Sequence, residues 1–166
     1  MARSSGSDDI DFESLYRSSR DDVYAYVAGV LRDRGAAEEV TAAAFERAFT
    51  RRSSFSPERG SPRAWLFGIA RNAAYDELRR RGRTEPVADP EERRAPQGDS
   101  TAEVAVRRAA LAAALATLSH DERELVALKF EAGLSGAEIG SVLEISETNV
   151  GTRVARVVAK LRTAMT

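Results

Sequence analysis

Residues 134–162 read LSGAEIGSVLEISETNVGTRVARVVAKLR, and this stretch decides the fold of the second half of the chain. Its apolar residues recur at helical spacing on both sides of a short break, which predicts helices over 136–143 and 147–162. Gly140 leaves room where the two helices cross, and Ser146 suits the N-cap of the second. The pattern therefore predicts a helix-turn-helix, in which the second helix is free to enter the major groove of DNA. Its packing positions are Ile139, Leu143, Ile145, Val150 and Val154.

Polar side chains occupy the outward, N-terminal part of the second predicted helix. Asn and Arg are the usual readers of adenine and guanine edges, and hydroxyl groups contact phosphates. An ordinary helical hairpin is the alternative interpretation. Glu144 stands where such turns often have glycine, and a left-handed Glu costs about 1–2 kcal/mol unless the turn has another geometry. The predicted DNA-contacting residues are Ser146, Thr148, Asn149, Thr152, Arg153 and Arg156, and Glu147 lies beside them.

A second informative stretch, residues 55–81, reads FSPERGSPRAWLFGIARNAAYDELRRR. Ser61 and Pro62 predict a helix start, with Ser as the N-cap and Pro in the first helical position. Aromatic residues interleaved with Arg and Asn suit single-stranded DNA, because planar groups stack on unpaired bases while basic groups bind phosphates. The polar loop before the helix is suited to holding one flipped base. Trp65 is equally well explained as a core residue, whereas Arg71 and Asn72 are polar within an apolar-periodic helix and favour a functional role.

The charge is unevenly distributed along a chain whose formal net charge is -1. Residues 1–50 hold six basic and ten acidic side chains, residues 62–83 hold six basic and two acidic ones, and residues 146–166 hold four basic and one acidic. Two basic segments in a nearly neutral chain indicate two nucleic-acid contact surfaces. The alternative is that Arg-rich helix ends merely complement helix dipoles.

The remaining patterns predict an all-α protein of two small helical domains joined by a flexible linker. Residues 1–8 are small and polar and are expected to be disordered. A helical pattern from Asp11 stops at Arg34-Gly35, a second helix covers 36–51, and the 61–81 helix is expected to end at Gly82. The predicted domains cover 9–82 and 101–166, and an acidic segment with three prolines over 83–100 is the linker.

Two apolar faces, two capping signals and a loop complete the predicted elements. Residues 53–60 are expected to form a loop. Ser119 with Glu122, and Ser135 with Glu138, match capping boxes. The predicted apolar faces are Val40, Phe45, Ala48 and Phe49 in the second helix, and Val104, Leu111, Leu115 and Leu118 after the linker.

Composition excludes several kinds of catalytic or metal site. The chain of 166 residues has no cysteine, so it cannot build a thiolate site. Its single histidine, His120, excludes a metal site with several His ligands, and a His-based triad would have to use this one residue. His120 follows the Ser119 cap and is expected at the surface. No apolar run approaches the roughly 20 residues that span a bilayer, so we expect a soluble, cytoplasmic protein without catalytic residues, bound metal or cofactor.

The chain resembles the extracytoplasmic-function sigma factors of bacterial RNA polymerase. Three motifs carry the resemblance: AAEEVTAAAFERAF at 36–49, GSPRAWLFGIARNAAYDELRRR at 60–81, and the 134–162 stretch. They occur in the family's order with a linker of the family's length. Residues 9–82 resemble the family's region 2, which binds core polymerase and the -10 element, and residues 101–166 resemble region 4, which reads the -35 element.

The resemblance implies partners and residue roles. The partners are core RNA polymerase, promoter DNA as duplex and as melted strand, and an anti-sigma protein. The 36–49 helix is expected to dock on the polymerase, with Glu38, Glu39 and Glu46 as its acidic contacts. The -35 element is read by the helix-turn-helix residues given above. The -10 element is expected to contact Phe55, Arg59, Ser61, Arg63, Arg71, Asn72, Arg79 and Arg80.

The sequence departs from the family pattern at four positions. Ala42 and Ala43 stand where the family usually has Gln and Glu, Gly151 stands where a basic residue is common, and Glu144 replaces the turn glycine. These departures bear on binding strength and promoter sequence rather than on the family. A regulator that binds only duplex DNA would explain the 134–162 stretch but not the 55–81 stretch, and an enzyme is disfavoured because the acidic pairs 38–39 and 76–77 lie on Arg-rich helices.

Overall fold

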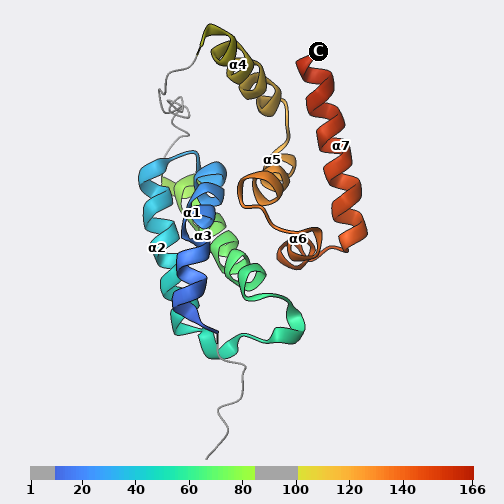
Figure 1. Ribbon diagram of the computed structural model, residues 1–166. Helices are drawn as coiled ribbons and strands as arrows, with labels where there is room; N and C mark the ends of the chain where they lie inside the picture. Colours follow the sequence, from blue (N-terminus) through green and yellow to red (C-terminus); the bar gives the residue numbers. More distant parts are fainter. Residues whose placement is uncertain (1–9, 85–100) are drawn as a thin grey trace, which may run out of the picture.

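The computed structural model describes residues 10–84 and 101–166, and this part of the chain contains helices and no strand, as predicted. In the first half, α1 (Phe12–Leu31), α2 (Arg34–Thr50) and α3 (Pro62–Thr84) pack side by side (Figure 1). Two short 3-10 turns, η1 (Arg52–Ser54) and η2 (Pro57–Arg59), lie within the predicted loop. The fully buried side chains of this half include Val23, Tyr26, Val27, Ala37, Ala44, Leu66, Phe67 and Ala70.

The junction between α1 and α2 differs from the predicted break at Arg34-Gly35. The chain turns at Arg32, which is left-handed with φ 54° and ψ 33°. Asp33 then caps α2, because its carboxylate accepts a hydrogen bond from the backbone N–H of Ala36 at 3.1 Å. Gly35 thus lies in the first turn of a helix. The stabilisation by the Asp33 cap outweighs the low helix propensity of this glycine.

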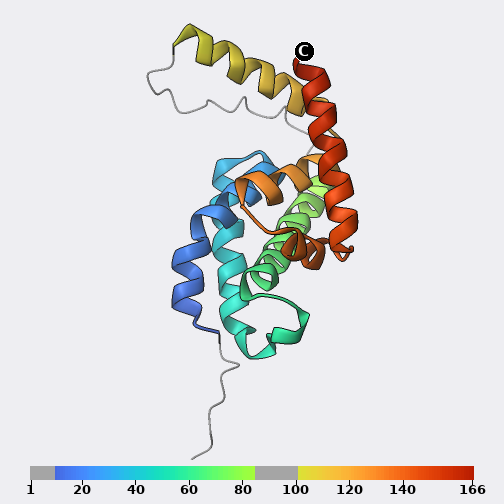
Figure 2. The ribbon, with the colours of Figure 1, turned by 45° about the vertical axis from the view of Figure 1, so that its right-hand side comes forward.

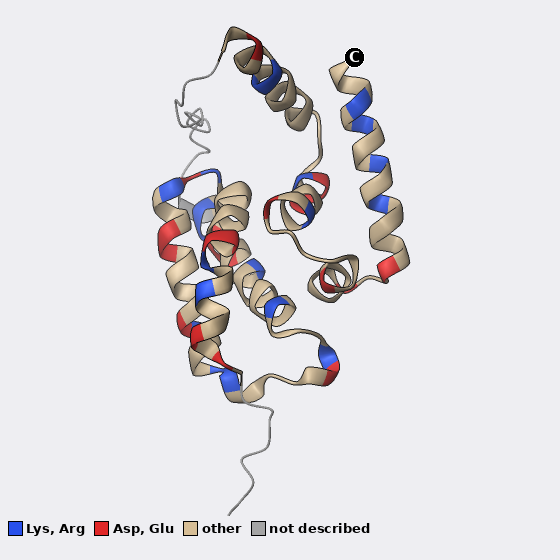
Figure 3. Ribbon diagram, viewed as in Figure 1, with Lys and Arg blue, Asp and Glu red and all other residues tan. Residues whose placement is uncertain are grey.

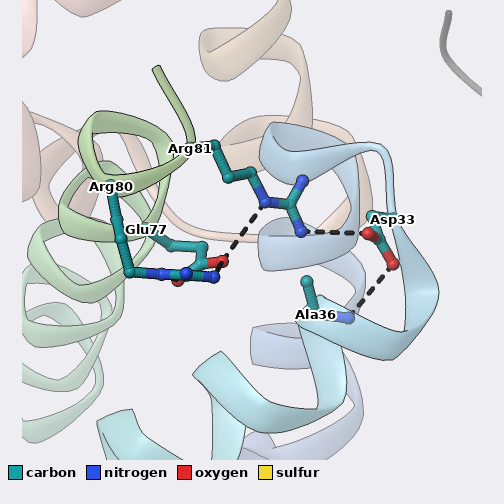
Figure 4. Close-up of polar contacts among 5 residues, drawn as sticks. All are labelled: Asp33, Ala36, Glu77, Arg80 and Arg81. Carbon is teal, nitrogen blue, oxygen red and sulfur yellow. Dashed lines mark hydrogen bonds and ion pairs between the residues drawn. The ribbon is translucent and has the colours of Figure 1, made fainter. Parts of the chain in front are cut away.

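The predicted end of α3 at Gly82 is also wrong, since the helix continues to Thr84. Arg81 pairs with Glu77 one turn earlier at 3.2 Å and with Asp33 at 2.9 Å (Figure 4). These ion pairs hold the last turns of α3 against the start of α2. Of the linker predicted over 83–100, residues 83 and 84 are therefore helical, and the remainder lies outside the described residues, as do residues 1–8.

The second half contains α4 (Ala102–Ala116), α5 (His120–Val126), a π-helical turn η3 (Ala127–Glu131), α6 (Gly136–Leu143) and α7 (Glu147–Met165). Both predicted capping boxes are confirmed, at the starts of α5 and α6. The predicted apolar stripe of α4 is wrong at its first two positions, because Val104 and Leu111 are exposed and only Leu115 and Leu118 pack. Phe49 of α2, predicted on an apolar face, is half exposed.

The helix-turn-helix is confirmed at the predicted positions. Glu144 adopts the left-handed conformation, with φ 58° and ψ 44°, and its N–H donates to the Gly140 carbonyl to close α6. A Cβ on Gly140 would lie only 2.7 Å from the Ile145 carbonyl oxygen, so the turn passes directly over this glycine. Because backbone blocks the space, only glycine permits this close crossing.

The two halves pack against each other. α1 contacts α5 and η3, and α3 contacts α6. Figures 1 and 2 show α5 and α6 lying against the three-helix half, while α4 and the C-terminal end of α7 extend away from it. The buried apolar residues of both halves form a single cluster. None of the helices described is both long and apolar enough to cross a membrane.

Two of the helix-turn-helix glycines, Gly140 and Gly151, predict opposite stability effects. Gly140→Ala should lower the free energy of unfolding by about 2 kcal/mol, because the new methyl group overlaps backbone. Gly151→Ala should raise it by about 1 kcal/mol, because Gly151 is an exposed helical residue with open space around it. Urea unfolding of both variants measures the difference, and equal effects would contradict the crossing described here.

Candidate nucleic-acid interface

The predicted reading face of α7 is exposed. Ser146 caps the helix by accepting a hydrogen bond from the Asn149 N–H at 3.1 Å, while Val150 and Val157 are buried on the opposite side. Arg153 Nε donates to Asn149 Oδ1 at 3.0 Å, which orders both side chains on the surface. All six residues predicted to contact duplex DNA are solvent-exposed: Ser146, Thr148, Asn149, Thr152, Arg153 and Arg156.

The capping box of α5 connects this helix to the recognition helix. The carboxylate of Glu122 accepts from the Ser119 N–H at 2.9 Å and from Lys160 Nζ of α7 at 2.9 Å. The Ser119 N–H, followed by the Lys160 ammonium, lowers the pKa of Glu122 to about 2. The same carboxylate thus begins one helix and ties α7 to it.

The side chains of α3 divide into two sets with different surroundings. Asn72, Arg79 and Arg80 are exposed, and Arg79 pairs with Asp76 at 2.8 Å. Arg63 and Arg71 lie at helical spacing on the side that faces the second half. Figure 3 shows basic residues at several places along the ribbon of α3. The predicted -10 residues therefore do not form one open surface in this structure.

The loop before α3 brings the remaining predicted -10 residues close to the second half. Phe55 packs edge-on against Trp65 at 5.7 Å, and Trp65 is itself partly buried against the core, as one of its two interpretations expects. Ser61 Oγ accepts from the Ala64 N–H as the predicted N-cap and donates to Glu138 at 2.9 Å. The carbonyl of Arg59 accepts from Ser141 Oγ, also at 2.9 Å.

A buried carboxylate, that of Glu124 in α5, lies at the junction of the two halves. It accepts hydrogen bonds from Tyr26 Oη at 2.8 Å, Arg71 Nε at 2.6 Å and Tyr75 Oη at 2.7 Å. Burial, reinforced by the Glu124 charge, raises the pKa of Tyr26 and of Tyr75, so both phenols stay protonated donors. Burial acts to lower the pKa of Arg71, but Glu124 outweighs it and the net direction is upward.

The sequence did not predict this junction, although one signal was present. Glu124 begins ELVALKF, an acidic residue entering an apolar run, and a carboxylate in such a place needs partners if it is buried. His120, predicted at the surface, is exposed but also approaches Tyr75 Oη with Nε2 at 2.7 Å. His120, Asp121 and Glu124 bring ligand atoms within 4.8 Å of one another, but Glu124 is already held by three donors.

The predicted polymerase-docking helix, α2, presents an acidic outer face. Glu38, Glu39 and Glu46 are exposed, while Ala44 and Phe45 are buried against α1 and α3. None of the three glutamates has an ion-pair partner within residues 10–84 and 101–166. Of the two departures in this helix, Ala42 is exposed on the outer face and Ala43 is half-buried.

Comparison with known proteins decides the family. Family models named Sigma-70 region 2 and Sigma-70, region 4 match residues 15–84 and 108–161. An ECF RNA polymerase sigma factor SigK of Mycobacterium sp. (strain KMS) is 30% identical over 156 residues, covering 88% of this chain and 79% of the relative. SigK of Mycobacterium bovis (strain BCG / Pasteur 1173P2) is 26% identical over 170 residues, covering 99% and 91%.

The chain belongs to the extracytoplasmic-function (ECF) sigma factors. It is thus a sigma factor that directs promoter recognition in transcription initiation. Its fold is similar to that of the sigma factor RpoE from Bartonella quintana, solved with the anti-sigma factor NepR, with a TM-score of 0.74, 23% identity and coverage of 93% and 96% of the two chains. CnrH, solved with the cytosolic domain of CnrY, has a TM-score of 0.65, 25% identity and coverage of 92% and 85%.

The lowered pKa of Glu122 predicts a pH dependence of stability. Its folded-state pKa lies below the usual value of 4.5, so its stabilising contribution is present above that value and is lost as the pH falls toward 2. Glu122→Gln keeps an acceptor for the capping box but does not titrate. The melting temperature of this variant should therefore fall less between pH 5 and pH 3 than that of the wild type.

Calorimetry at several pH values measures this difference. Thr163→Ala, a neutral change in the same helix as Lys160, serves as the control and should follow the wild type. Identical pH profiles for Glu122→Gln and the wild type would show that this carboxylate has no such role.

Proposed function

We propose that this sigma factor reads its promoter with two separate surfaces, one on each half of the chain. The observation that carries the proposal is the exposed polar face of α7 together with the exposed Asn72, Arg79 and Arg80 of α3. A regulator that binds duplex DNA alone needs only the first surface. Both surfaces in one chain match a protein that reads one duplex element and holds one melted element.

The face of α7 is assigned to the -35 element. Asn149, Arg153 and Arg156 have the donor and acceptor groups that distinguish bases in the major groove. Ser146 and Thr148 lie at the helix N-terminus, where hydroxyl groups and the helix dipole favour phosphate. Thr152 lies one turn further along the same face. Phosphate contacts supply most of the affinity, and the base contacts supply the choice of sequence.

The loop before α3 and the α3 helix are assigned to the melted -10 element. Unstacking a base costs a few kcal/mol, and capture of the flipped base offsets this cost. Asn72 and Arg71 are the proposed contacts to the base edge, while Phe55 offers an aromatic surface close to Trp65. The basic residues Arg59, Arg63, Arg79 and Arg80 are the proposed contacts to the strand backbone. Binding in this way stabilises the open promoter without any bond being made or broken.

The outer face of α2 is assigned to core RNA polymerase. Glu39 and Glu46 lie seven residues apart and therefore on one side of the helix, with Glu38 beside them. Ala42, on the same exposed side, offers a methyl group where the family usually has a larger polar side chain, so the contact area is reduced there. We assign no catalytic residue, and we place the protein with the polymerase in the cytoplasm.

An anti-sigma protein is the proposed regulatory partner. CnrH, at 25% identity, was solved with the cytosolic domain of CnrY, and RpoE was solved with the anti-sigma factor NepR. Both align with more than nine-tenths of this chain. A partner of this kind supplies the signal that frees the sigma factor for core polymerase.

Transcription in vitro with the cognate core polymerase over a promoter library tests the whole proposal. We expect a subset of templates to be transcribed, and these templates to share two sequence elements. Silence on every template, together with intact binding to duplex DNA, would favour the regulator that binds duplex alone.

Asn72→Ala should lower open-complex formation at least tenfold while leaving polymerase binding unchanged, because it removes a base contact made only after melting. Permanganate footprinting measures melting, and co-purification with core polymerase measures binding. Arg17→Ala, on the exposed face of α1, is the matched control and should behave as the wild type. Normal melting by Asn72→Ala would remove this residue from the -10 site.

Gly151→Arg should strengthen promoter binding, because it adds a cation to the exposed face of α7. One added phosphate contact increases the slope of log affinity against log salt by about 1. Gly151→Ala separates this effect from the gain in helix stability, since it stabilises the helix without adding charge. Equal salt slopes for the two variants would show that position 151 does not face phosphate.

A further inference from the structure

Part of the proposed -10 surface is covered by the second half of the same chain. Arg63 donates a hydrogen bond to the carbonyl of Ala132, and Ser61 donates to Glu138 of α6. The carbonyl of Arg59 is bound by Ser141 of the same helix. The side chains of Ser61 and Arg63 and the backbone of Arg59 are therefore held by contacts within the protein.

Glu124 holds the side chain of a fourth -10 residue, Arg71, at 2.6 Å. All three of its donors, Tyr26, Arg71 and Tyr75, belong to the first half, whereas Glu124 belongs to the second. The carboxylate is only 4% exposed, and a buried charge is stable only while it is paired. The same Arg71 cannot pair with Glu124 and contact a flipped base at once.

The spacing of the two promoter elements gives an independent argument. By their names, the -10 and -35 elements lie about 25 base pairs apart, which at about 3.4 Å per base pair is on the order of 85 Å of duplex. In this structure the loop before α3 and helix α6 of the helix-turn-helix are in direct contact, with 2.9 Å between Ser61 Oγ and Glu138. One chain in this arrangement cannot read both elements.

We propose that the free sigma factor is self-inhibited, with Glu124 as the lock that holds the second half over the -10 surface. Binding to core polymerase and promoter separates the halves. Glu124 is then hydrated, and the side chain of Arg71 is free to contact DNA. This inference rests on the proposed function, because it needs the assignment of the -10 surface to residues 55–80. Glu124 acts as a positioning residue that never contacts DNA.

The structure offers a cross-link that tests the closed arrangement directly. A Cβ on Gly29 of α1 would lie 3.8 Å from the Cβ of Ala127 in η3, which is the mean Cβ separation in disulfides. The chain has no cysteine of its own, so Gly29→Cys combined with Ala127→Cys can form only this bridge within one chain. The bridge joins the two halves, and neither Gly29 nor Ala127 is one of the proposed DNA contacts.

The double variant should form the disulfide under mild oxidation, as seen by altered gel mobility, and each single variant should not. The oxidised form should initiate transcription at less than about a tenth of the rate of the reduced form. Failure of the bridge to form, or equal rates for the oxidised and reduced forms, would overturn self-inhibition. The wild-type chain is run in parallel, because its failure to transcribe any template would instead overturn the proposed function.

A second variant tests the lock without altering the packing of η3. Glu124→Ala should bind a single-stranded oligonucleotide of the -10 element about tenfold more tightly than the wild type in the absence of polymerase. The factor follows if the closed form makes up about nine-tenths of the free protein, because apparent affinity scales with the open fraction.

Asp121→Ala is the matched control for Glu124→Ala, since it removes an exposed carboxylate from the same helix. Asp121→Ala should bind the oligonucleotide as the wild type does. Fluorescence anisotropy measures both affinities, and circular dichroism checks that the helices remain. Unchanged or weaker binding by a folded Glu124→Ala would show that Glu124 does not restrain the first half.

Discussion

The arrangement of the two halves depends on a buried carboxylate and its three donors. Glu124 lies where α5 meets α1 and α3, and each donor comes from the opposite half of the chain. A buried charge with good partners contributes orientation more than net stability, because desolvation offsets much of the attraction. Removal of one member leaves the others unpaired in a poorly hydrated site, so this group of residues favours one arrangement of the halves strongly.

As a consequence, the two proposed DNA-binding surfaces differ in how much of each is exposed. The proposed contacts on α7 are exposed, and a hydrogen bond orders Arg153 and Asn149, while Arg153 and Arg156 also line a cavity shared with Arg71 and Glu124. The -10 surface is divided, since Asn72 is open while Arg71 is held by Glu124. In the proposed self-inhibition, the strand-binding surface is exposed only when polymerase and promoter supply enough interaction to separate the halves.

The departures from the family pattern have local physical effects. Glu144 is left-handed where glycine would be unstrained, and Gly151 weakens an exposed helix that a basic residue would support. Both lie in the helix-turn-helix. The same motif is well capped at Ser135 and Ser146 and tightly crossed at Gly140, so its geometry is kept while its stability and charge are reduced.

The sequence alone determined the helix-turn-helix, the capping boxes, the start of α3 and the exposure of the α7 contacts, because each depends on residues within a few positions of one another. Only the tertiary structure decided the end of α3, which Asp33 holds from 48 residues away, and the Glu124 junction, whose partners are 49 to 98 residues away. Helical periodicity identifies which face is buried but not what covers it. The contacts that cover Arg63 and Arg71 therefore could not be predicted from the sequence, since they depend on how the two halves of the chain meet in space.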